Sequence, residues 1–326
     1  MKQVVLEAPG RFTEREAPIP TVSEGHALVR MEKVGVCGSD FHAFTGHQPI
    51  YTYPRIIGHE LSGVVVEAPA NDYGIRAGDH CAIEPYMSCR KCRACAMGRN
   101  NCCEHIRLLG IHVDGGLQEY LSVPIGLLNK SSRLSLDQLA LVETLGIGAH
   151  AVKRSGLKTG EEALIVGAGP IGIAVAQFAS ALGARVHMVE KSEWRRAFVE
   201  RMGYTSSLTA EGRQADAVFD ATGNTVAMSS SLANVATGGS LIFVGLTHDP
   251  VCLDDVLFHR KEVTLLASRN SVGLFPQIIR LIEEGKIDTS HWITDRLKLS
   301  EVASQFQSLT TRQTLIKAIV DVNRHE

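Results

Sequence analysis

Four cysteines within a fifteen-residue stretch carry the most specific chemical signal in the sequence. Cys89, Cys92, Cys95 and Cys103 follow the spacing C-x2-C-x2-C-x7-C. Four thiolates that converge on one point form the closed tetrahedral ligand set of a structural zinc ion. Cys102 adjoins Cys103, so the spacing leaves open which of the two is the fourth ligand. The alternative, a loop of reduced or disulfide-paired cysteines, is disfavoured by this clustering in a reducing compartment.

A thiol, an imidazole and a carboxylate form a second candidate metal set. Cys37 lies in a Cys-Gly-Ser-Asp sequence, and His59 and Glu60 lie in Gly-His-Glu. Mixed ligands of these types are typical of catalytic zinc, where one position stays open for water or substrate. Spacing alone does not show that Cys37 and His59 meet. A single cysteine or histidine is otherwise more often part of the core.

A glycine-rich turn at residues 167–172 predicts a dinucleotide site. Its sequence fits G-x-G-x-x-G and lies between an apolar run and a helix-length apolar stretch. Glycines in such a turn let backbone N–H groups approach a pyrophosphate at the helix N-terminus. Similar turns also occur for packing reasons, so the prediction depends on this context. The turn residues expected to contact the cofactor are Gly167, Gly169, Pro170, Ile171 and Gly172.

Glu190 ends the next predicted strand, 18 residues after Gly172. A carboxylate at that point would bind the ribose hydroxyls and repel a 2′-phosphate, which predicts NAD rather than NADP. Lys191 and Arg195 are the nearby residues that would accommodate NADP. Further predicted strands end at the same sheet edge, where open α/β sheets bind ligands. The alternative to a cofactor contact there is an ordinary loop glycine. The cofactor candidates at those ends are Thr222, Gly245 and Leu246.

The elements that must position these groups change type near residue 145. Before it, short strands are separated by turns, and the alternation at 27–32 predicts a half-buried strand. After it, strands and helices alternate, which predicts a parallel sheet covered on both faces. The predicted strands there are 162–166, 184–190, 216–221, 239–246 and 263–268, and the predicted helices are 171–182 and 192–202, the second with Ser192 as its candidate cap. A tail from about residue 272 is predicted to contain a helix at 274–284 and a strand at 314–320.

Composition limits the possible partners. Hydrophobic residues make up 44% of the 326 residues, as in a globular protein with a core, and the net charge is −2. This charge gives no electrostatic reason to expect nucleic acid or an anionic membrane surface as a partner. No apolar run approaches the roughly 20 residues that span a bilayer, and the N-terminus lacks a signal-peptide core. The sequence therefore predicts a cytoplasmic protein.

In this order, the motifs resemble the zinc-containing medium-chain dehydrogenase/reductases, in particular the branch of sorbitol, threonine and sugar-acid dehydrogenases. The resemblance covers essentially the whole chain. It implies a GroES-like, mostly-β catalytic domain at 1–145, to which 272–326 returns, and a doubly wound Rossmann domain at 146–271. The motifs that carry it are Cys37-Gly38-Ser39-Asp40, Gly58-His59-Glu60, the four cysteines, Asp114-Gly115-Gly116-Leu117-Gln118-Glu119-Tyr120 and the glycine turn.

The resemblance implies that Cys37 and His59 bind the catalytic zinc. Two carboxylates could complete the set. Glu60 adjoins His59, and in regular strand geometry the two would point to opposite faces. Glu143 matches the position that supplies or supports a metal-site carboxylate in the polyol branch, so we expect exchange between direct and water-mediated contact. Asp40 matches the carboxylate that orients the ligand histidine.

The resemblance also implies a route for the proton that leaves the substrate hydroxyl when the hydride passes to the nicotinamide. Ser39 and His42 match its relay positions, and the alternative is a turn serine and a solvated histidine. Residues 268–270 and 109–116 look most like dehydrogenases of gulonate, idonate or galactonate. Arg269 would pair with a substrate carboxylate, unless it holds a cofactor phosphate or a structural carboxylate. The further substrate candidates are Arg55, His112 and Glu143.

We therefore expect an enzyme that oxidises a secondary hydroxyl of an aldonate or polyol to a ketone with NAD. It would bind two zinc ions per chain, one catalytic and one structural, and form a homodimer or homotetramer. The alternatives are a threonine or amino-alcohol dehydrogenase, and a zinc-stabilised nucleotide-binding regulatory protein. Compared with the family, residues 203–216 are short, which predicts a truncated crossover without a helix.

Overall fold

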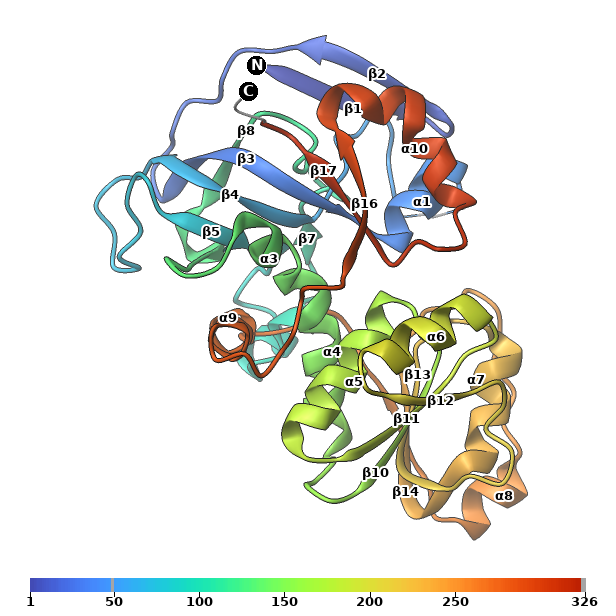
Figure 1. Cartoon of the computed structure of the whole chain (residues 1–326). Helices are drawn as coiled ribbons and strands as arrows, with labels where there is room; N and C mark the ends of the chain where they lie inside the picture. The colour runs from blue at the N-terminus through green and yellow to red at the C-terminus, as the bar shows by residue number, and fades with distance from the viewer. Residues whose placement is uncertain (48–49, 324–326) are drawn as a thin grey trace. The chain divides into compact units, whose positions relative to one another are not determined.

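The computed structural model describes residues 1–47 and 50–323 and divides into two compact units (Figure 1). The chain builds most of the first unit, continues into the second and then returns to the first. Unit 1 comprises Met1–Glu143, Phe275–Glu283 and Thr289–Glu326, and unit 2 comprises Thr144–Leu274 and Glu284–Asp288.

Unit 1 is built on a seven-stranded sheet in the order β16-β17-β3-β4-β5-β9, with β8 also paired to β3. The strand β17, near the C-terminus, lies antiparallel to β3, so that Ala318 pairs with Val36 just before Cys37. The sheet strands are β3 (His26–Val36), β4 (Glu60–Glu67), β5 (His80–Ile83), β8 (Tyr120–Pro124), β9 (Leu128–Lys130), β16 (Ile293–Lys298) and β17 (Lys317–Asp321).

Shorter elements surround this sheet. The strands β1 (Lys2–Ala8) and β2 (Arg11–Glu16) pair with each other, as do β6 (Tyr86–Met87) and β7 (Arg107–Leu108). The helices are α1 (Gly38–Thr45), α2 (Arg93–Ala96), α3 (Leu136–Ala140), α9 (Phe275–Glu283) and α10 (Val302–Thr310), with 3-10 turns η1 (Asn100–Cys102), η2 (Ile125–Leu127) and η4 (Leu299–Glu301).

The strand predicted at 27–32 exists as part of β3, but the prediction that it is half-buried is wrong. The alternation places Ala27, Val29 and Met31 on the buried face and Arg30 and Glu32 on the polar face, yet Glu32 is buried, as is Leu28 beside them. The Arg30 guanidinium donates to the Glu32 carboxylate at 2.7 Å, and this ion pair allows a carboxylate to lie on a covered face. Alternation of polar and apolar residues therefore identified the strand but not its surroundings.

Unit 2 contains a six-stranded, fully parallel sheet in the order β12-β11-β10-β13-β14-β15, so the predicted doubly wound sheet is confirmed. Its strands are β10 (Glu162–Val166), β11 (Arg185–Val189), β12 (Thr205–Ser207), β13 (Ala215–Asp220), β14 (Val235–Phe243) and β15 (Thr264–Ala267). Its helices are α5 (Pro170–Leu182), α6 (Glu193–Arg201), α7 (Thr225–Ser231) and α8 (Asp255–Arg260), with η3 (Leu232–Asn234), while α4 (Val142–Ser155) begins in unit 1.

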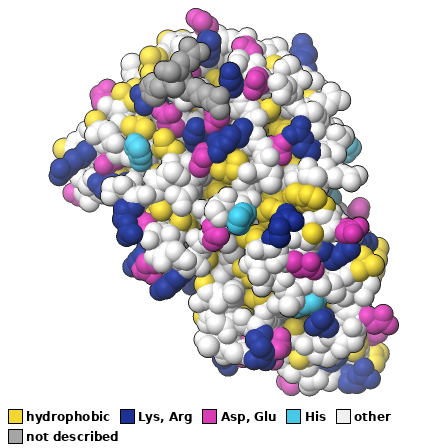
Figure 2. All heavy atoms as spheres, in the orientation of Figure 1, with side chains coloured by type: hydrophobic (Ala, Val, Ile, Leu, Met, Phe, Trp, Pro, Cys, Tyr) yellow, Lys and Arg dark blue, Asp and Glu magenta, His cyan; other side chains and the backbone are white. Residues whose placement is uncertain are grey.

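The chain between β12 and β13 contains turns and no helix, as predicted. Ser192 caps α6 as predicted, since its hydroxyl accepts from the Arg195 amide at 3.4 Å. Within the described residues, no helix has both the length and the apolar character needed to cross a membrane. Basic and acidic side chains are interspersed on the face shown in Figure 2.

Candidate functional site

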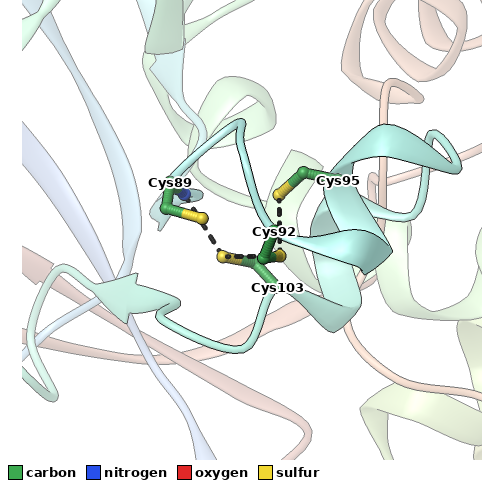
Figure 3. Close-up of side chains that lie close together, drawn as sticks. All are labelled: Cys89, Cys92, Cys95 and Cys103. Carbon is green, nitrogen blue, oxygen red and sulfur yellow. Dashed lines mark hydrogen bonds between the residues drawn. The ribbon is translucent and has the colours of Figure 1, made fainter.

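Four cysteine sulfurs converge in the loop region between β6 and β7 (Figure 3). The Sγ atoms of Cys89, Cys92, Cys95 and Cys103 all lie within 4.8 Å of one another. Helix α2 begins directly after Cys92 and carries Cys95, which brings their sulfurs to 3.5 Å. Cys102 is exposed and lies outside this group, whereas its neighbour Cys103 is buried within it. The geometry favours Cys103 over Cys102 as the fourth ligand.

Backbone amides donate hydrogen bonds to some of these sulfurs. The amides of Cys89 and His105 donate to Cys103 Sγ at 3.2 and 3.3 Å. Hydrogen bonds from the Cys95 and Glu104 amides lower the pKa of Cys92 to about 6, while burial and the Cys92 thiol raise that of Cys95 to about 12. A cation would favour the ionised form of every sulfur. The donor set therefore fits a structural zinc ion.

The second candidate set also converges. The ligand atoms of Cys37, His59 and Glu60 lie within 4.8 Å of one another. Cys37 precedes α1, and His59 lies just outside β4, which begins at Glu60. Gly58 has φ of +98°, a turn conformation that glycine adopts readily. Because His59 is not part of the strand, the expectation that His59 and Glu60 point to opposite faces is wrong.

Asp40 and Ser39 lie on either side of the His59 ring. His59 Nδ1 is 3.6 Å from Asp40 Oδ1, and His59 Nε2 is 3.5 Å from Ser39 Oγ. Both Nδ1 and that carboxylate oxygen are buried without a hydrogen bond of standard geometry. Burial lowers the pKa of His59, but the charges of Asp40 and Cys37 outweigh burial and raise it. This negative surrounding favours a bound cation, and the sulfur, nitrogen and oxygen donors fit zinc.

Glu143 lies near this set without belonging to it. It is buried in the first turn of α4, and its carboxylate accepts a hydrogen bond from the Tyr86 hydroxyl. Burial raises the pKa of Glu143, with a further contribution from the charge of Glu60, and Glu143 in turn raises the pKa of His59. No motif in the sequence marks Tyr86, because its role depends on a partner 57 residues away.

Lys317 is a second residue that the sequence did not single out. Its Nζ donates to Glu60 Oε1 at 2.6 Å and to Oε2 at 2.8 Å. Both side chains are fully buried. A lysine is almost never fully buried unless it is paired, so the charged residue inside the apolar run 314–320 was a usable signal.

The two predicted relay residues lie on α1. Ser39 contacts His59 as described, and His42 follows one turn later with an exposed side chain. Residues three apart on a helix are neighbours on its surface. The structure therefore brings Ser39 to the candidate metal set and places His42 at the surface of unit 1, without testing the relay itself.

Three of the substrate candidates have the following surroundings. The Arg55 guanidinium donates to Asp114 at 3.1 Å and to Thr52 at 2.9 Å. His112 has an exposed side chain, and its Nδ1 accepts from the Leu108 amide at 3.1 Å. Arg269 is exposed in the segment that follows β15 in unit 2. A role in substrate binding stays a prediction for each of them.

The Asp-Gly-Gly segment next to Arg55 packs against the turn that carries His59. Asp114 Oδ1 accepts from the Ile56 amide at 3.1 Å, and the Gly116 amide donates to Gly58 O at 3.1 Å. A β-carbon at Gly115 would overlap Gly58 O, so only glycine allows this contact. The motif therefore supports the backbone of the candidate metal set.

The glycine turn in unit 2 leaves the N-terminus of α5 accessible. Gly167 has φ of +99°, and a β-carbon at Gly172 would overlap Gly167 O. Gly169 caps α5, and the nearest atom to a β-carbon there would be Arg195 Nη1 at 3.7 Å. Pro170 and Ile171 open the helix. Two glycines thus serve packing, while the third leaves room above the helix N-terminus for a phosphate.

Glu190 lies beside this turn, as predicted. Its carboxylate accepts from the amides of Ala168 and Ser192, each at 2.8 Å. The Arg196 guanidinium donates to the backbone oxygen of Glu190 at 2.7 Å and holds the strand end from the other side. A fixed carboxylate therefore stands next to the open helix N-terminus.

The turns after β13 and β14 contact each other at the same sheet edge. Thr222 is exposed, and its hydroxyl donates to buried Asp220 at 2.9 Å. A β-carbon at Gly245 would overlap the Gly223 amide nitrogen, and Gly223 itself has φ of +64° with Leu246 O 2.6 Å from where its β-carbon would lie. Leu246 is 76% exposed, so its side chain is available to a ligand rather than used in the core.

Comparisons with known proteins agree with these features. Residues 23–132 match the alcohol dehydrogenase GroES-like domain, and residues 170–284 match the zinc-binding dehydrogenase family. L-galactonate-5-dehydrogenase of Escherichia coli (strain K12) is 36% identical over 335 residues, which cover 98% of each chain.

Two solved structures share the fold of the whole chain. A short chain alcohol dehydrogenase from E. coli CFT073, complexed with NADH, has a TM-score of 0.93 at 26% identity and 99% coverage of both chains. A zinc-binding dehydrogenase from Sinorhizobium meliloti 1021, bound to NADP, has a TM-score of 0.91 at 28% identity, with 98% of this chain and 99% of that chain covered. The chain therefore belongs to the zinc-binding, nicotinamide-dependent alcohol dehydrogenases of the medium-chain dehydrogenase/reductase family.

Proposed function

We propose that this enzyme oxidises a secondary hydroxyl of a sugar acid (an aldonate) or a polyol to the ketone, reversibly, with NAD as the hydride acceptor. The observation that supports it most is the convergence of Cys37, His59 and Glu60 next to Ser39 in a buried, negatively charged setting. The 36% identical relative is named for a sugar acid, L-galactonate. We extend that substrate class to this chain.

Two zinc ions per chain belong to the proposal. The four cysteines would hold the structural ion, and Cys37 and His59 the catalytic one, with Glu60 or Glu143 as the carboxylate. When bound, the catalytic ion supplies Lewis acidity that lowers the pKa of a substrate hydroxyl. In unit 1, the buried Asp40 carboxylate lies 3.6 Å from His59 Nδ1, where it would orient the ring and leave Nε2 for the ion.

Ser39 and His42 would carry the proton away from the substrate. The Ser39 hydroxyl lies beside His59, where it can accept a proton from the substrate hydroxyl as it donates its own to a cofactor ribose hydroxyl, which would pass a proton on to His42. His42 has an exposed ring one turn later on α1 and can exchange a proton with water. Ser39→Ala tests the relay. We expect this variant to lose turnover while it still binds the cofactor.

NAD is proposed over NADP because Glu190 holds a carboxylate next to the open N-terminus of α5. A 2′-phosphate would meet like charge at that point. Arg195, whose guanidinium lies near Gly169, and exposed Lys191 are the cations that would favour NADP. Cofactor contacts with Thr222, Gly245 and Leu246 are part of the same proposal.

For the substrate we propose Arg269 as the first guanidinium to test, because it matches a position near the polyol in the sorbitol branch and a guanidinium there could pair with a substrate carboxylate. His112 and Glu143 remain candidate substrate contacts. Unit 1 would be the catalytic domain and unit 2 the NAD-binding domain. We also propose a homodimer or homotetramer, supported by the edge strand β15 with its exposed Leu265. A cytoplasmic location is proposed because eight cysteines outside disulfide bonds suit a reducing compartment.

Hydride transfer measured by absorbance tests the proposal. NAD and NADP would each be offered with aldonates, polyols, threonine and simple alcohols, and zinc would be quantified on the same sample. We expect about two zinc ions per chain and NAD reduction with an aldonate or a polyol. Turnover of threonine alone would replace the substrate class, and two bound zinc ions without any turnover would favour a regulatory nucleotide-binding role.

A further inference from the structure

Lys317 joins the C-terminal strand of unit 1 to the candidate catalytic metal set. Its Nζ donates to both Glu60 oxygens, at 2.6 and 2.8 Å, and to Val36 O at 3.3 Å. Val36 is the residue before Cys37. The Lys317 ammonium group therefore contacts the candidate ligand Glu60 directly, and it also contacts the backbone of the residue before the candidate ligand Cys37.

The Glu60 carboxylate occupies a slot that three strands form together. Glu60 on β4 pairs with Gly35 on β3, and β17 lies on the other side of β3. A β-carbon at Gly35 would overlap Glu60 Oε2, so the carboxylate fills the space of the missing side chain. With Lys317 at 2% and Glu60 at 1% side-chain exposure, water does not compete for this ion pair.

The charges around the slot explain why a cation is needed there. The ligand atoms of Glu60, Cys37 and His59 lie within 4.8 Å of one another, and the Lys317 ammonium is a cation in hydrogen-bond contact with both Glu60 oxygens. A buried carboxylate that loses its counter-ion must find another cation or take up a proton. The nearest cation available to Glu60 would then be the ion held by Cys37 and His59.

We propose that Lys317 is a positioning residue that binds Glu60 and thereby limits its bonding to the catalytic zinc. The open position that substrate needs is kept open because the carboxylate is already engaged by the ammonium group. Removal of Lys317 frees Glu60 to complete the ligand set, so the ion is held more tightly and substrate is excluded. This inference rests on the proposed zinc site at Cys37 and His59.

The test compares zinc release from the holoenzyme of Lys317→Met with the wild type, using a chromogenic chelator. We expect the catalytic ion to leave about 10- to 100-fold more slowly, and kcat to fall about 100-fold. Lys317→Arg should restore both values to near those of the wild type. The double variant Lys317→Met/Glu60→Gln should release zinc at the same rate as the single variant Glu60→Gln, because it has no carboxylate at position 60 that could bind the ion.

Lys33→Met is the matched control. Lys33 also pairs with a buried carboxylate, Asp321 at 2.7 Å, on the same sheet, but Asp321 is not in the candidate metal set. This variant should leave the zinc release rate unchanged. If Lys317→Met does not fold, Lys317→Gln keeps a donor to Glu60 without the charge and should slow zinc release by a smaller factor.

The two proposals fail in different ways. If the wild type holds two zinc ions and turns over substrate, but Lys317→Met and Lys317→Gln release zinc as fast as Lys33→Met or faster, the positioning role is wrong. If Lys317→Met releases zinc faster than the wild type, and adding Glu60→Gln to that variant does not change the rate, Lys317 has a purely structural role. If the wild type binds zinc only at the four cysteines, the proposed function fails and this inference fails with it.

Discussion

The Glu190 carboxylate accepts a hydrogen bond from the Ala168 amide at 2.8 Å and so ties the end of β11 to the glycine turn after β10. Its second oxygen accepts from the Ser192 amide at 2.8 Å. Two fixed donors hold the negative charge in one place before any cofactor binds. Pre-organised charge of this kind discriminates between ligands because it does not have to be ordered during binding.

Replacing Glu190 with Ser should change the cofactor preference. Without the carboxylate, a 2′-phosphate meets no like charge, so we expect the NAD-to-NADP ratio of kcat/KM to fall about 100-fold, which corresponds to about 2.7 kcal/mol. Steady-state rates with both cofactors measure this ratio. Glu193→Ser, in the first turn of α6 and exposed, is the control and should leave the ratio unchanged. An unchanged ratio in Glu190→Ser would remove the basis for proposing NAD.

Two glycines of the same turn should respond differently to alanine. At Gly172 a β-carbon overlaps Gly167 O, so Gly172→Ala should lower the free energy of unfolding by about 1–3 kcal/mol. At Gly169 the nearest atom is 3.7 Å away, so Gly169→Ala should fold normally but bind NADH about tenfold more weakly.

Urea unfolding and NADH fluorescence titration on both variants separate these effects. The paired result matters more than either value, since each variant is the control for the other. If Gly169→Ala binds NADH as tightly as the wild type, the phosphate does not lie at that helix N-terminus.

Serine at Cys102 and at Cys103 should distinguish the fourth ligand of the cysteine set. Cys103 Sγ belongs to the converged group and accepts two amide hydrogen bonds, whereas Cys102 is exposed. We expect Cys103→Ser to hold one zinc ion fewer per chain and to unfold at a lower temperature. Cys102→Ser should keep both ions, as measured by metal analysis after gel filtration. The reverse pattern would show that Cys102 binds the ion in solution.

Glu84 predicts a pH dependence of stability. Burial, with the Glu143 charge, raises the pKa of Glu84 from 4.5 to about 7. Between these values the folded protein binds more protons than the unfolded chain, so the free energy of unfolding falls as pH rises through this window. Glu84→Gln removes this loss and should stabilise the protein by about 1–3 kcal/mol at pH 8.

The comparison that isolates this effect is urea unfolding at about pH 5 and pH 8. At the lower pH the wild-type carboxyl is largely protonated in the folded state, so the gain from Glu84→Gln should be smaller there. Exposed Glu67 on β4 is the control, since Glu67→Gln should change stability little at either pH. An equal gain at both pH values for Glu84→Gln would contradict the raised pKa.

Local patterns in the sequence were enough for the features that depend on residues close together in the chain. The glycine turn, the Ser192 cap and the alternation of strands and helices are each determined within about one helical turn or strand, and the structure agrees with them. The four cysteines fall within fifteen residues, so their convergence also needs only one loop. The choice of Cys103 over Cys102 already required the loop conformation.

The surroundings of the second metal set depended on the tertiary structure. Strand geometry applied to adjacent residues placed His59 and Glu60 on opposite faces, and the turn at Gly58 reversed that result. Lys317 reaches Glu60 across 257 residues and Tyr86 reaches Glu143 across 57. Neither pair has a spacing that a sequence pattern could reveal. β17 lies beside β3 only after the sheet has formed, and Tyr86 on β6 meets Glu143 on α4 only in the folded protein. The sequence thus determined which donor types are present, while strand pairing decided which buried charges hold them in place.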